Sequence, residues 1–308
     1  MKLIGENLHI ISASTREAIL AGDEKFVRNL ISRQVDAGMD FIDLNIGPAK
    51  KNFEGIMQWL VAIHKDISNI PISFDSSNIS EIESGLNLIK NPSDCIINST
   101  SADTEKLEAF TDLAKQYDSN LICLTLSKES GIPKVADERL ALAFEMVEFA
   151  NNKGIENNKL YFDPLILPLS VEQTQACEAL NAIRMFKESF DPVVNTTIGL
   201  SNISNGSPKE LRGLINRVFF VLASGCGLDS AIVDAFDTEL LRINKVIKNG
   251  HAEKKSDELV LNLVESMRNF DDLNSVQYDS SDEEQVKIYK TAEILLNKKV
   301  YSHSYLDI

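Results

Sequence analysis

The stretch Thr197-Ile-Gly-Leu-Ser-Asn202 decides how the chain is expected to fold. Its apolar, β-branched start gives way to small and amide-bearing residues, which predicts a buried strand with Ser201 and Asn202 at its carboxyl-terminal tip. Four other apolar runs end in the same way, and their polar residues are Asp43 with Asn45, Asp75, Asn98 and Asp163. Buried polar groups cost free energy unless they are paired, so five such endings predict one polar pocket at the strand tips.

Runs of strand length alternate with stretches of helical periodicity along most of the chain. The expected strands are 3–7, 41–46, 71–75, 95–98, 121–126, 160–162, 197–202 and 230–234. The expected helices are 23–37, 56–63, 79–89, 104–117, 137–152, 171–190, 212–223 and 238–248, with Asp23 and Thr238 as amino-terminal caps. About eight β-then-α units in about 250 residues is the pattern of a (β/α)₈ TIM barrel. A doubly wound open sheet is the alternative, but it gathers ligands at one switch point, not around a ring of strand tips.

The alternation breaks after residues 1–250, which are expected to form the barrel. Residues 251–285 contain ten acidic and three basic residues, a net charge of −7 out of −15 for the whole chain. The apolar spacing of Val260, Leu263 and Val264 predicts a helix within this acidic insertion. Because the insertion follows the eighth helix, it is expected on the face opposite the strand tips, as an assembly surface or a solvated excursion. Residues 286–308 are expected to form a helix and tail that pack on the barrel.

Composition and charge narrow the classes of function. The chain has 308 residues, of which 44% are hydrophobic and 25% are charged. It lacks both a secretory start and an apolar run of about 20 residues, so a cytoplasmic protein without membrane spans is expected. The net charge of −15 argues against nucleic acid and anionic membranes as partners. The four cysteines and four histidines are scattered without paired spacing, so no bound metal is expected.

The chemistry of the predicted pocket is that of hydrogen bonding to a polar ring. Carboxylates accept hydrogen bonds, whereas asparagine amides both donate and accept. A carboxylate opposite an N–H/NH₂ edge accepts two parallel hydrogen bonds, and amides can read a neighbouring carbonyl. Pterins and purines both fit this description. Taken singly, Asp43 or Asp163 could instead satisfy backbone groups where a strand ends.

Several stretches resemble the pterin-binding (β/α)₈ methyltransferases, and within them the methyltetrahydrofolate:corrinoid/iron–sulfur protein methyltransferases of the anaerobic acetyl-CoA pathway. The matching stretches are Ile42-Asp-Leu-Asn-Ile-Gly-Pro48, Phe74-Asp-Ser-Ser-Asn78, Ile97-Asn-Ser-Thr100, Phe162-Asp-Pro-Leu-Ile-Leu-Pro168, Gly199-Leu-Ser-Asn202, Leu214-Ile-Asn-Arg217 and Thr291-Ala-Glu-Ile-Leu-Leu-Asn297. The resemblance covers almost the whole chain except the acidic insertion.

The resemblance implies roles for individual residues. Asp75, Asn98 and Asp163 would hold the pterin, and Asn202 would supply a catalytic amide at N5. Further folate contacts are implied near Asn205 and Arg212, although residues 205–213 form a longer segment than is usual in the family, and Gly213 stands where proline is common. The candidate substrate-binding set is completed by residues of the same predicted pocket: Asp43, Asn45 and Ser201.

The resemblance also implies the reaction, which moves a methyl group between 5-methyltetrahydrofolate and the cobalt of a corrinoid. A tertiary amine is a poor leaving group, and a positioned amide can hydrogen-bond N5 as its basicity rises. The chain has no Asp-x-His-x-x-Gly motif of a cobalamin-binding domain, so the corrinoid is expected on a partner, a corrinoid (iron–sulfur) protein. The family is dimeric, which implies a homodimer.

Three alternatives stay open. A dihydropteroate synthase-like enzyme would share the pterin pocket, but it needs a site for a diphosphate leaving group, and the segment after the last expected strand, Asp234-Ala-Phe-Asp237, is acidic. A methyltetrahydrofolate:corrinoid methyltransferase of a demethylation system would use the same chemistry. A protein that only binds folate, with the acidic insertion as an assembly surface, would not be an enzyme.

Overall fold

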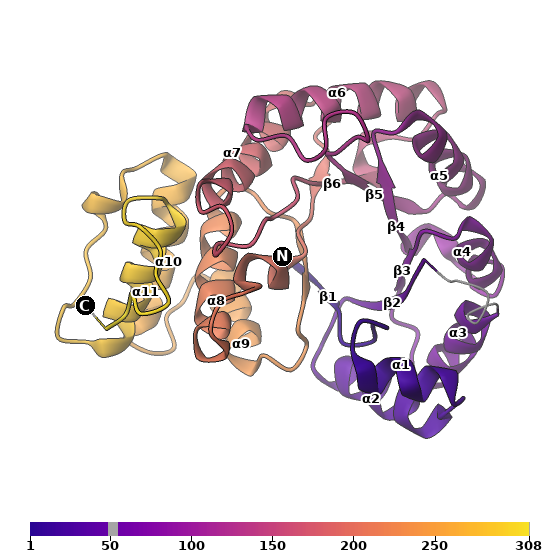
Figure 1. The fold of residues 1–308 in the computed structure, drawn as a ribbon, viewed down its shortest axis with the longest axis horizontal. Helices are drawn as coiled ribbons and strands as arrows, with labels where there is room; N and C mark the ends of the chain where they lie inside the picture. Colours follow the sequence, from indigo (N-terminus) through magenta and orange to yellow (C-terminus); the bar gives the residue numbers. More distant parts are fainter. Residues whose placement is uncertain (49–54, 308) are drawn as a thin grey trace.

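Eight parallel strands form one nearly closed barrel in the computed structural model, which describes residues 1–48 and 55–307 (Figure 1). The order in the sheet is β7-β6-β5-β4-β3-β2-β1-β8, so β1 to β7 each pair with their sequence neighbours among these seven strands, and β8 pairs with β1. The (β/α)₈ prediction is confirmed. Ile308, the last residue of the predicted tail, lies outside the described residues. The strands are β1 (Lys2–Gly5), β2 (Phe41–Gly47), β3 (Ile72–Ser76), β4 (Ile96–Ser101), β5 (Asn120–Leu124), β6 (Leu160–Asp163), β7 (Asn195–Thr196) and β8 (Ser230–Val233).

Helices surround this barrel and extend beyond it at the carboxyl-terminal end of the chain. The α-helices are α1 (Ala13–Leu20), α2 (Glu24–Asp36), α3 (Ile56–Ile67), α4 (Ile79–Leu86), α5 (Thr104–Tyr117), α6 (Ala136–Asn152), α7 (Thr174–Ser189), α8 (Lys209–Gly225), α9 (Thr238–Asn249), α10 (Ser256–Asn269) and α11 (Glu283–Leu295). The 3₁₀ helices are η2 (Pro92–Asp94), η3 (Asn157–Lys159), η4 (Leu200–Ser204) and η5 (Leu273–Ser275).

Two of the predicted helix starts can be checked at their caps. Asp23 caps α2 as expected, because its carboxylate accepts a hydrogen bond from the backbone N–H of Phe26 at 3.0 Å. The expected Thr238 cap of α9 is wrong by one residue. Asp237 caps this helix instead, accepting from the N–H of Leu240 at 3.0 Å, and a carboxylate at this position also favours the positive end of the helix dipole.

The expected strand 197–202 is wrong, because β7 contains only Asn195 and Thr196. The chain then touches β8 through a single bridge between Gly199 and Ile232, whose N–H donates to the carbonyl of Ile198 at 2.8 Å. After Gly199 the backbone turns into η4. Short polar residues there favour local hydrogen bonds over a sheet ladder, and the N–H of Asn202 donates to the carbonyl of Gly199 at 3.2 Å.

The interior of the barrel is closed at the amino-terminal ends of the strands. A separate cluster of buried side chains fills it, formed by Ile4, Phe41, Ile96, Ile122 and Tyr161. Strand residues two apart point to the same face. The residues two positions further along these strands therefore point into the barrel above the cluster, and they include Glu6, Asp43, Asn98 and Asp163. The site can open only at the carboxyl-terminal ends.

The acidic insertion packs against the barrel, so the expectation of a solvated excursion is wrong for its helix. The apolar face of α10 lies on α8, and its buried side chains are Leu259, Val260, Leu263 and Val264. The two backbones approach closely at Gly225, where an added Cβ would collide with the carbonyl oxygen of Val264 and lie 2.5 Å from Cβ of Met267. Figure 1 shows α10 and α11 side by side along the outer side of α8 and α9.

An ion-pair network holds the start of α10 beside the start of α9. Asp257 is fully buried and accepts both guanidinium arms of Arg242 at 2.7 Å, together with the backbone N–H groups of Glu253 and Lys254. Lys254 also pairs with Glu239, in the first turn of α9, at 3.0 Å. Because α9 starts just after the tip of β8, residues 250–256 return towards the strand tips and do not stay on the opposite face as expected.

No described helix has the length and apolar character that a bilayer span requires.

Candidate active site

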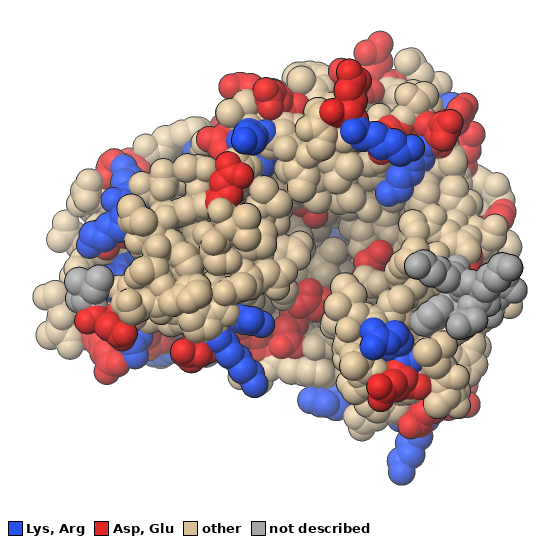
Figure 2. Space-filling model, in the orientation of Figure 1, with Lys and Arg blue, Asp and Glu red and all other residues tan. Residues whose placement is uncertain are grey.

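The strand register brings three of the expected residues into one layer of the pocket. Asn45 of β2 is aligned with Asp75 of β3, and Asp75 is aligned with Asn98 of β4. The amide nitrogen of Asn45 donates to the carboxylate of Asp75, which fixes that carboxylate at the tip of its strand. Figure 2 shows a hollow in the middle of this face with acidic side chains inside it. Because the bond from Asn45 uses only part of one oxygen of Asp75, the other oxygen and part of the first remain for a ligand with N–H groups.

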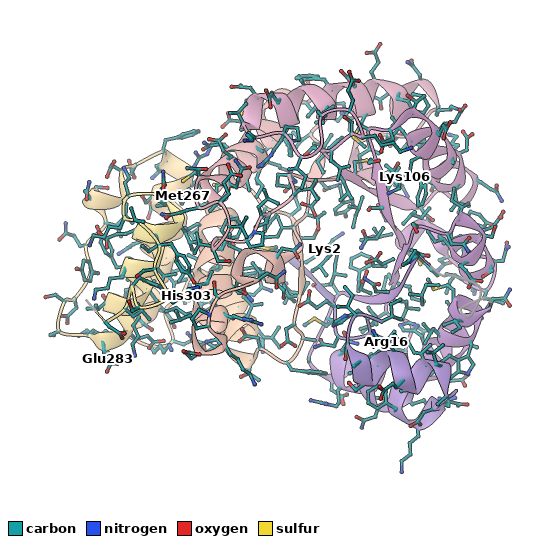
Figure 3. All side chains as sticks on the ribbon, in the orientation of Figure 1. Lys2, Arg16, Lys106, Met267, Glu283 and His303 are labelled. Atoms are coloured by element: carbon teal, nitrogen blue, oxygen red, sulfur yellow. The ribbon has the colours of Figure 1, made fainter. Side chains whose placement is uncertain are left out.

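Burial makes Asp75 an unusual carboxyl group. It raises the pKa of Asp75 to about 7, and the positive charge of Lys106 opposes this shift. Lys106 stands in the first turn of α5 and is half-buried, and Figure 3 labels it at the side of the ring near β4 and β5. A ligand that donates hydrogen bonds to Asp75 would favour the ionised form, because such bonds stabilise the charge.

Asp43 lies two residues before Asn45 on the same face of β2, one layer deeper in the barrel. Burial raises its pKa well above the usual range, and the nearby charge of Asp75 adds to that shift. The amide of Asn98 donates to Asp43 over 3.4 Å. Asp43 is 2% exposed. Asp43 is therefore placed to orient the Asn98 amide from deeper in the barrel, and it is less well placed to contact a ligand.

Asp163 faces this group from the opposite wall, at the end of β6. Burial raises its pKa to about 6, whereas hydrogen bonds from the N–H groups of Leu165 and Gly199 and the charge of Arg139 lower it. The Leu165 bond is 2.7 Å long. Arg139 is fully buried and is held by the carbonyl of Pro133 at 3.1 Å and by a glutamine of α7. A second carboxylate with a neighbouring cation is therefore available to a ligand.

Ser201 and Asn202 reach the pocket on η4 and not on a strand. The hydroxyl of Ser201 donates to the carboxylate of Glu6, just beyond β1. Asn202 is exposed, and its amide nitrogen lies only 2.9 Å from the point where a Cβ on Gly199 would stand. Glycine at 199 thus leaves the room that the Asn202 side chain occupies. The sequence prediction placed both residues at the pocket but on the wrong kind of element.

Asn205 and Arg212 lie further from the centre, and both are exposed. The amide of Asn205 reaches the side-chain oxygen of Asn202 over 3.5 Å. Arg212, in the first turn of α8, donates through Nε to the carbonyl of Ser207 at 2.8 Å. Asn205 therefore stands directly after η4, and Arg212 of α8 is bound to the segment that joins η4 to α8.

Two residues near the pocket were missed by the reading of the sequence. Burial raises the pKa of Glu6 to about 7, against the hydrogen bond from Ser201, and the charges of Asp234 and Asp43 add to the rise. The run Leu3-Ile-Gly-Glu-Asn7 ends in polar residues like the other five, so the same rule could have found Glu6. Lys106 has no such signal, because a lysine in the first turn of a helix is commonplace on a protein surface.

Comparison with known proteins shows the family to which the chain belongs. The family described as "Pterin binding enzyme" matches residues 12–234. The methylcorrinoid:tetrahydrofolate methyltransferase of Eubacterium limosum is 29% identical over 243 residues, which cover 78% of this chain and 88% of that protein. The methionine synthase of Mycobacterium leprae is 27% identical over 255 residues, but the chain spans only 21% of its length.

Solved structures give the same fold. The dihydropteroate synthase of Yersinia pestis matches with a TM-score of 0.54 at 16% identity and covers 80% of this chain and 93% of that one. The enzyme of Vibrio fischeri matches with a TM-score of 0.57 at 16% identity, covering 82% and 94%. At this identity the likeness is one of fold alone. The family match extends over most of the barrel, and the chain belongs to the pterin-binding enzymes.

Proposed function

We propose that the chain is a methyltransferase that moves a methyl group between N5 of 5-methyltetrahydrofolate and the cobalt of a corrinoid carried by a partner protein. The observation that carries this proposal is the arrangement around the hollow. Asp75 and Asp163 stand on opposite walls, each with acceptor capacity left beyond its bonds within the protein, and the Asn202 amide is exposed on η4. Asn98 completes the set that would read the ring.

Asn202 would act on the bond that changes. The reduced cobalt would supply the electron pair of the new bond to the methyl group. The electron pair of the broken bond stays on N5, which becomes more basic and finally takes up a proton from water. An amide hydrogen bond aimed at N5 strengthens as this charge develops, so it stabilises the transition state more than the bound substrate. In the reverse direction, from methylcorrinoid to tetrahydrofolate, the reaction passes through the same transition state, so the same amide hydrogen bond stabilises it.

The segment after β8 favours methyl transfer over a dihydropteroate synthase-like reaction, which must hold a diphosphate leaving group. Asp234 accepts from the amide of Asn7 at 2.7 Å, and Asp237 binds Arg217 through both carboxylate oxygens. Arg217 is thus already paired with a carboxylate, and Arg33 lies over the ring of Phe236 at 3.9 Å from its centroid. Two acidic side chains here would repel a diphosphate.

The rim of the hollow suits a protein partner. Among the described residues, the three most exposed large apolar side chains are Val300, Ile11 and Val171, at 87%, 80% and 77%. Ile11 lies between β1 and α1 and Val171 between β6 and α7, while Val300 lies beside Gln173 at the start of α7. All three surround the strand tips. Methyl transfer requires cobalt to approach N5 closely, so a corrinoid protein would have to cover this rim.

The reaction itself provides the test. Stopped-flow absorbance would follow reduced cobalamin with 5-methyltetrahydrofolate, and methylcobalamin with tetrahydrofolate; we expect transfer in both arms. A third arm would offer a dihydropterin diphosphate and p-aminobenzoate, for which we expect no condensation. Condensation without methyl transfer would replace the proposal by the synthase-like alternative. Tight folate binding with neither reaction would favour a protein that only binds folate.

The name of the Eubacterium limosum relative describes transfer from a methylcorrinoid to tetrahydrofolate. This favours, for the present chain, a role in a demethylation system over one in the acetyl-CoA pathway.

A homodimer remains part of the proposal and can be measured by light scattering. Partner docking can be measured with Val171→Lys, which should weaken transfer to a corrinoid protein several-fold but spare transfer to free cobalamin. Val193→Lys, before β7 on the opposite face, is the matched control.

A further inference from the structure

The carboxyl-terminal tail, residues 297–306, returns to the strand-tip side of the barrel. The side chain of Gln173, just before α7, holds it there. Its amide nitrogen donates to the carbonyls of Ile294 at 2.8 Å and Lys299 at 2.5 Å, and its oxygen accepts from the N–H of Tyr301 at 2.7 Å. His303, labelled in Figure 3, marks the tail on the side of the molecule where α8 and α10 pack. The tail is thus attached beside the loop that leaves β6.

From this attachment Tyr301 reaches the segment that follows η4. Its hydroxyl is 2.8 Å from Oγ of Ser207, which is only 2% exposed. The N–H of Ser207 donates to the carbonyl of Ser204, the last residue of η4, at 3.0 Å. The carbonyl of Ser207 accepts from Nε of Arg212 at 2.8 Å. One hydroxyl of the tail therefore fixes the residue that joins η4 to α8.

Contacts from outside must determine where η4 lies. A 3₁₀ helix of five residues has few hydrogen bonds of its own, and their geometry is poorer than in an α-helix. On one side the N–H of Leu169 donates to the carbonyl of Ile203 at 2.9 Å, and the hydroxyl of Ser170 donates to the carbonyl of Asn205 at 2.8 Å. Two further bonds hold its ends: the hydroxyl of Ser201 donates to the carboxylate of Glu6 near the start of η4, and the bond between Ser207 and Tyr301 stands just after its end.

We infer that Tyr301 is a positioning residue for Asn202. Its hydroxyl, through Ser207, fixes the carboxyl-terminal end of η4 and so the place of the Asn202 amide over the pocket. This inference rests on the proposed methyl transfer for its catalytic meaning, although the positioning itself does not. Through Ser207 and η4, the tail would thereby affect the reaction, although it lies about 100 residues after Asn202 in the chain.

The tail offers a matched control for the obvious variant. Tyr305 also forms a hydroxyl–hydroxyl hydrogen bond, to Oγ1 of Thr291 at 2.8 Å, but this bond lies between the tail and α11 and does not reach η4. Tyr301→Phe and Tyr305→Phe each remove one oxygen and keep the ring. The ring centroids of the two tyrosines lie 5.9 Å apart, and because both variants keep their rings, this contact is retained in each.

The kinetic test compares single-turnover methyl transfer with folate affinity. We expect Tyr301→Phe to slow transfer from 5-methyltetrahydrofolate to reduced cobalamin about tenfold, since a misplacement of about 1 Å can cost about a hundredfold. Its affinity for 5-methyltetrahydrofolate should change less than about threefold, because Asp75 and Asp163 are untouched. Ser207→Ala should give the same loss, and the double variant should be no slower than either single one. Tyr305→Phe should transfer at nearly the normal rate.

A second readout does not depend on the reaction. Backbone amide hydrogen exchange of residues 200–207 should be faster in Tyr301→Phe than in the wild type or in Tyr305→Phe. If the wild type transfers no methyl group, the proposed function fails, and this exchange pattern still decides whether Tyr301 holds η4. Unchanged exchange in Tyr301→Phe, or an equal slowing of transfer by Tyr305→Phe, would overturn the inference.

Discussion

On one wall of the pocket, the tips of β2, β3 and β4 hold Asn45, Asp75 and Asn98 in adjacent register positions, whereas Asn202 stands on η4, outside any strand. The first group is fixed by sheet hydrogen bonds and by the bond from Asn45 to Asp75. The second depends on contacts from Glu6, from the loop after β6 and from the tail. Regular strands thus supply the groups that would bind the ring, and an irregular segment supplies the group that would act on N5.

This contrast has a physical reason. A carboxylate that binds a flat ring needs a fixed place in both the bound and the reacting complex, which a strand tip provides. The amide that would follow a change of charge at one atom stands on η4 and not on a strand. The comparison predicts that changes on the strand side alter affinity and that changes on η4 alter rate.

The largest effect is expected for Asn202→Ala. Loss of one preorganised hydrogen bond to a developing charge typically costs about 10²–10³ in rate, so single-turnover transfer should fall by this factor. Affinity for 5-methyltetrahydrofolate should change far less, because the bond strengthens mainly in the transition state. Stopped-flow transfer and equilibrium binding on the same preparation give both numbers. A normal rate at saturation with weakened affinity would make Asn202 a binding residue and erase the contrast.

On the strand side, Asp75→Ala and Asp163→Ala should act on affinity. Hydrogen bonds to charged groups contribute about 1.5–3 kcal/mol, so either change should weaken binding of 5-methyltetrahydrofolate by about 10- to 150-fold. Calorimetric titration measures the loss, and Asp66→Ala on the outer surface of α3 is a control with the same change of charge. If both pocket variants bind as the wild type does, the ring does not lie between these two strands.

The same contrast explains what could be predicted from the sequence. Alternation along β2, β3, β4 and β6 gave the strand tips and their polar residues, because side chains in strands repeat every two residues and each tip lies at the same edge. The run that ends at Asn202 has the same apolar start, but its short polar residues bond locally and form η4. The turn of residues 250–256 back towards the strand tips depends on the ion pair between Arg242 and the buried Asp257, which no local pattern reveals.

Gly199→Ala sharpens the comparison, because it keeps Asn202 but disturbs its place. The new Cβ would stand 2.9 Å from the amide nitrogen of Asn202, closer than ordinary contact, so the amide must rotate away. We expect transfer to slow by about 10- to 100-fold with little change in affinity. Gly213→Ala is the control, since its Cβ would lie 3.5 Å from Arg217 in α8, an ordinary contact. Equal rates in both glycine variants would mean that the orientation of the Asn202 amide is unimportant.

The smallest effect concerns pH and belongs to the strand side. Asp75 must be ionised to accept the ring, and its pKa in the free protein is raised to about 7, mainly by burial. Affinity for 5-methyltetrahydrofolate should therefore fall about tenfold between pH 8 and pH 6.

Stability of the free protein should change in the opposite direction. Because the folded pKa lies above the unfolded value of 3.8, the folded state binds more protons in this interval, so the free energy of unfolding rises as pH falls from 8 towards 4. Between pH 8 and pH 6 the rise from this one carboxyl should be about 1 kcal/mol. Denaturant unfolding and folate binding, each measured at both pH values, test the pair of slopes. Asp75→Asn should reduce both slopes by the share of this carboxyl, while Glu6 and Asp163, whose pKa values burial raises to about 7 and about 6, keep the remainder. Comparing the variant with the wild type removes any titration of the folate itself. Asp66→Asn should keep both slopes. Wild-type affinity that does not vary over this range would show that Asp75 binds the ring without a change of charge, and its place as the charged partner of the pterin would be lost.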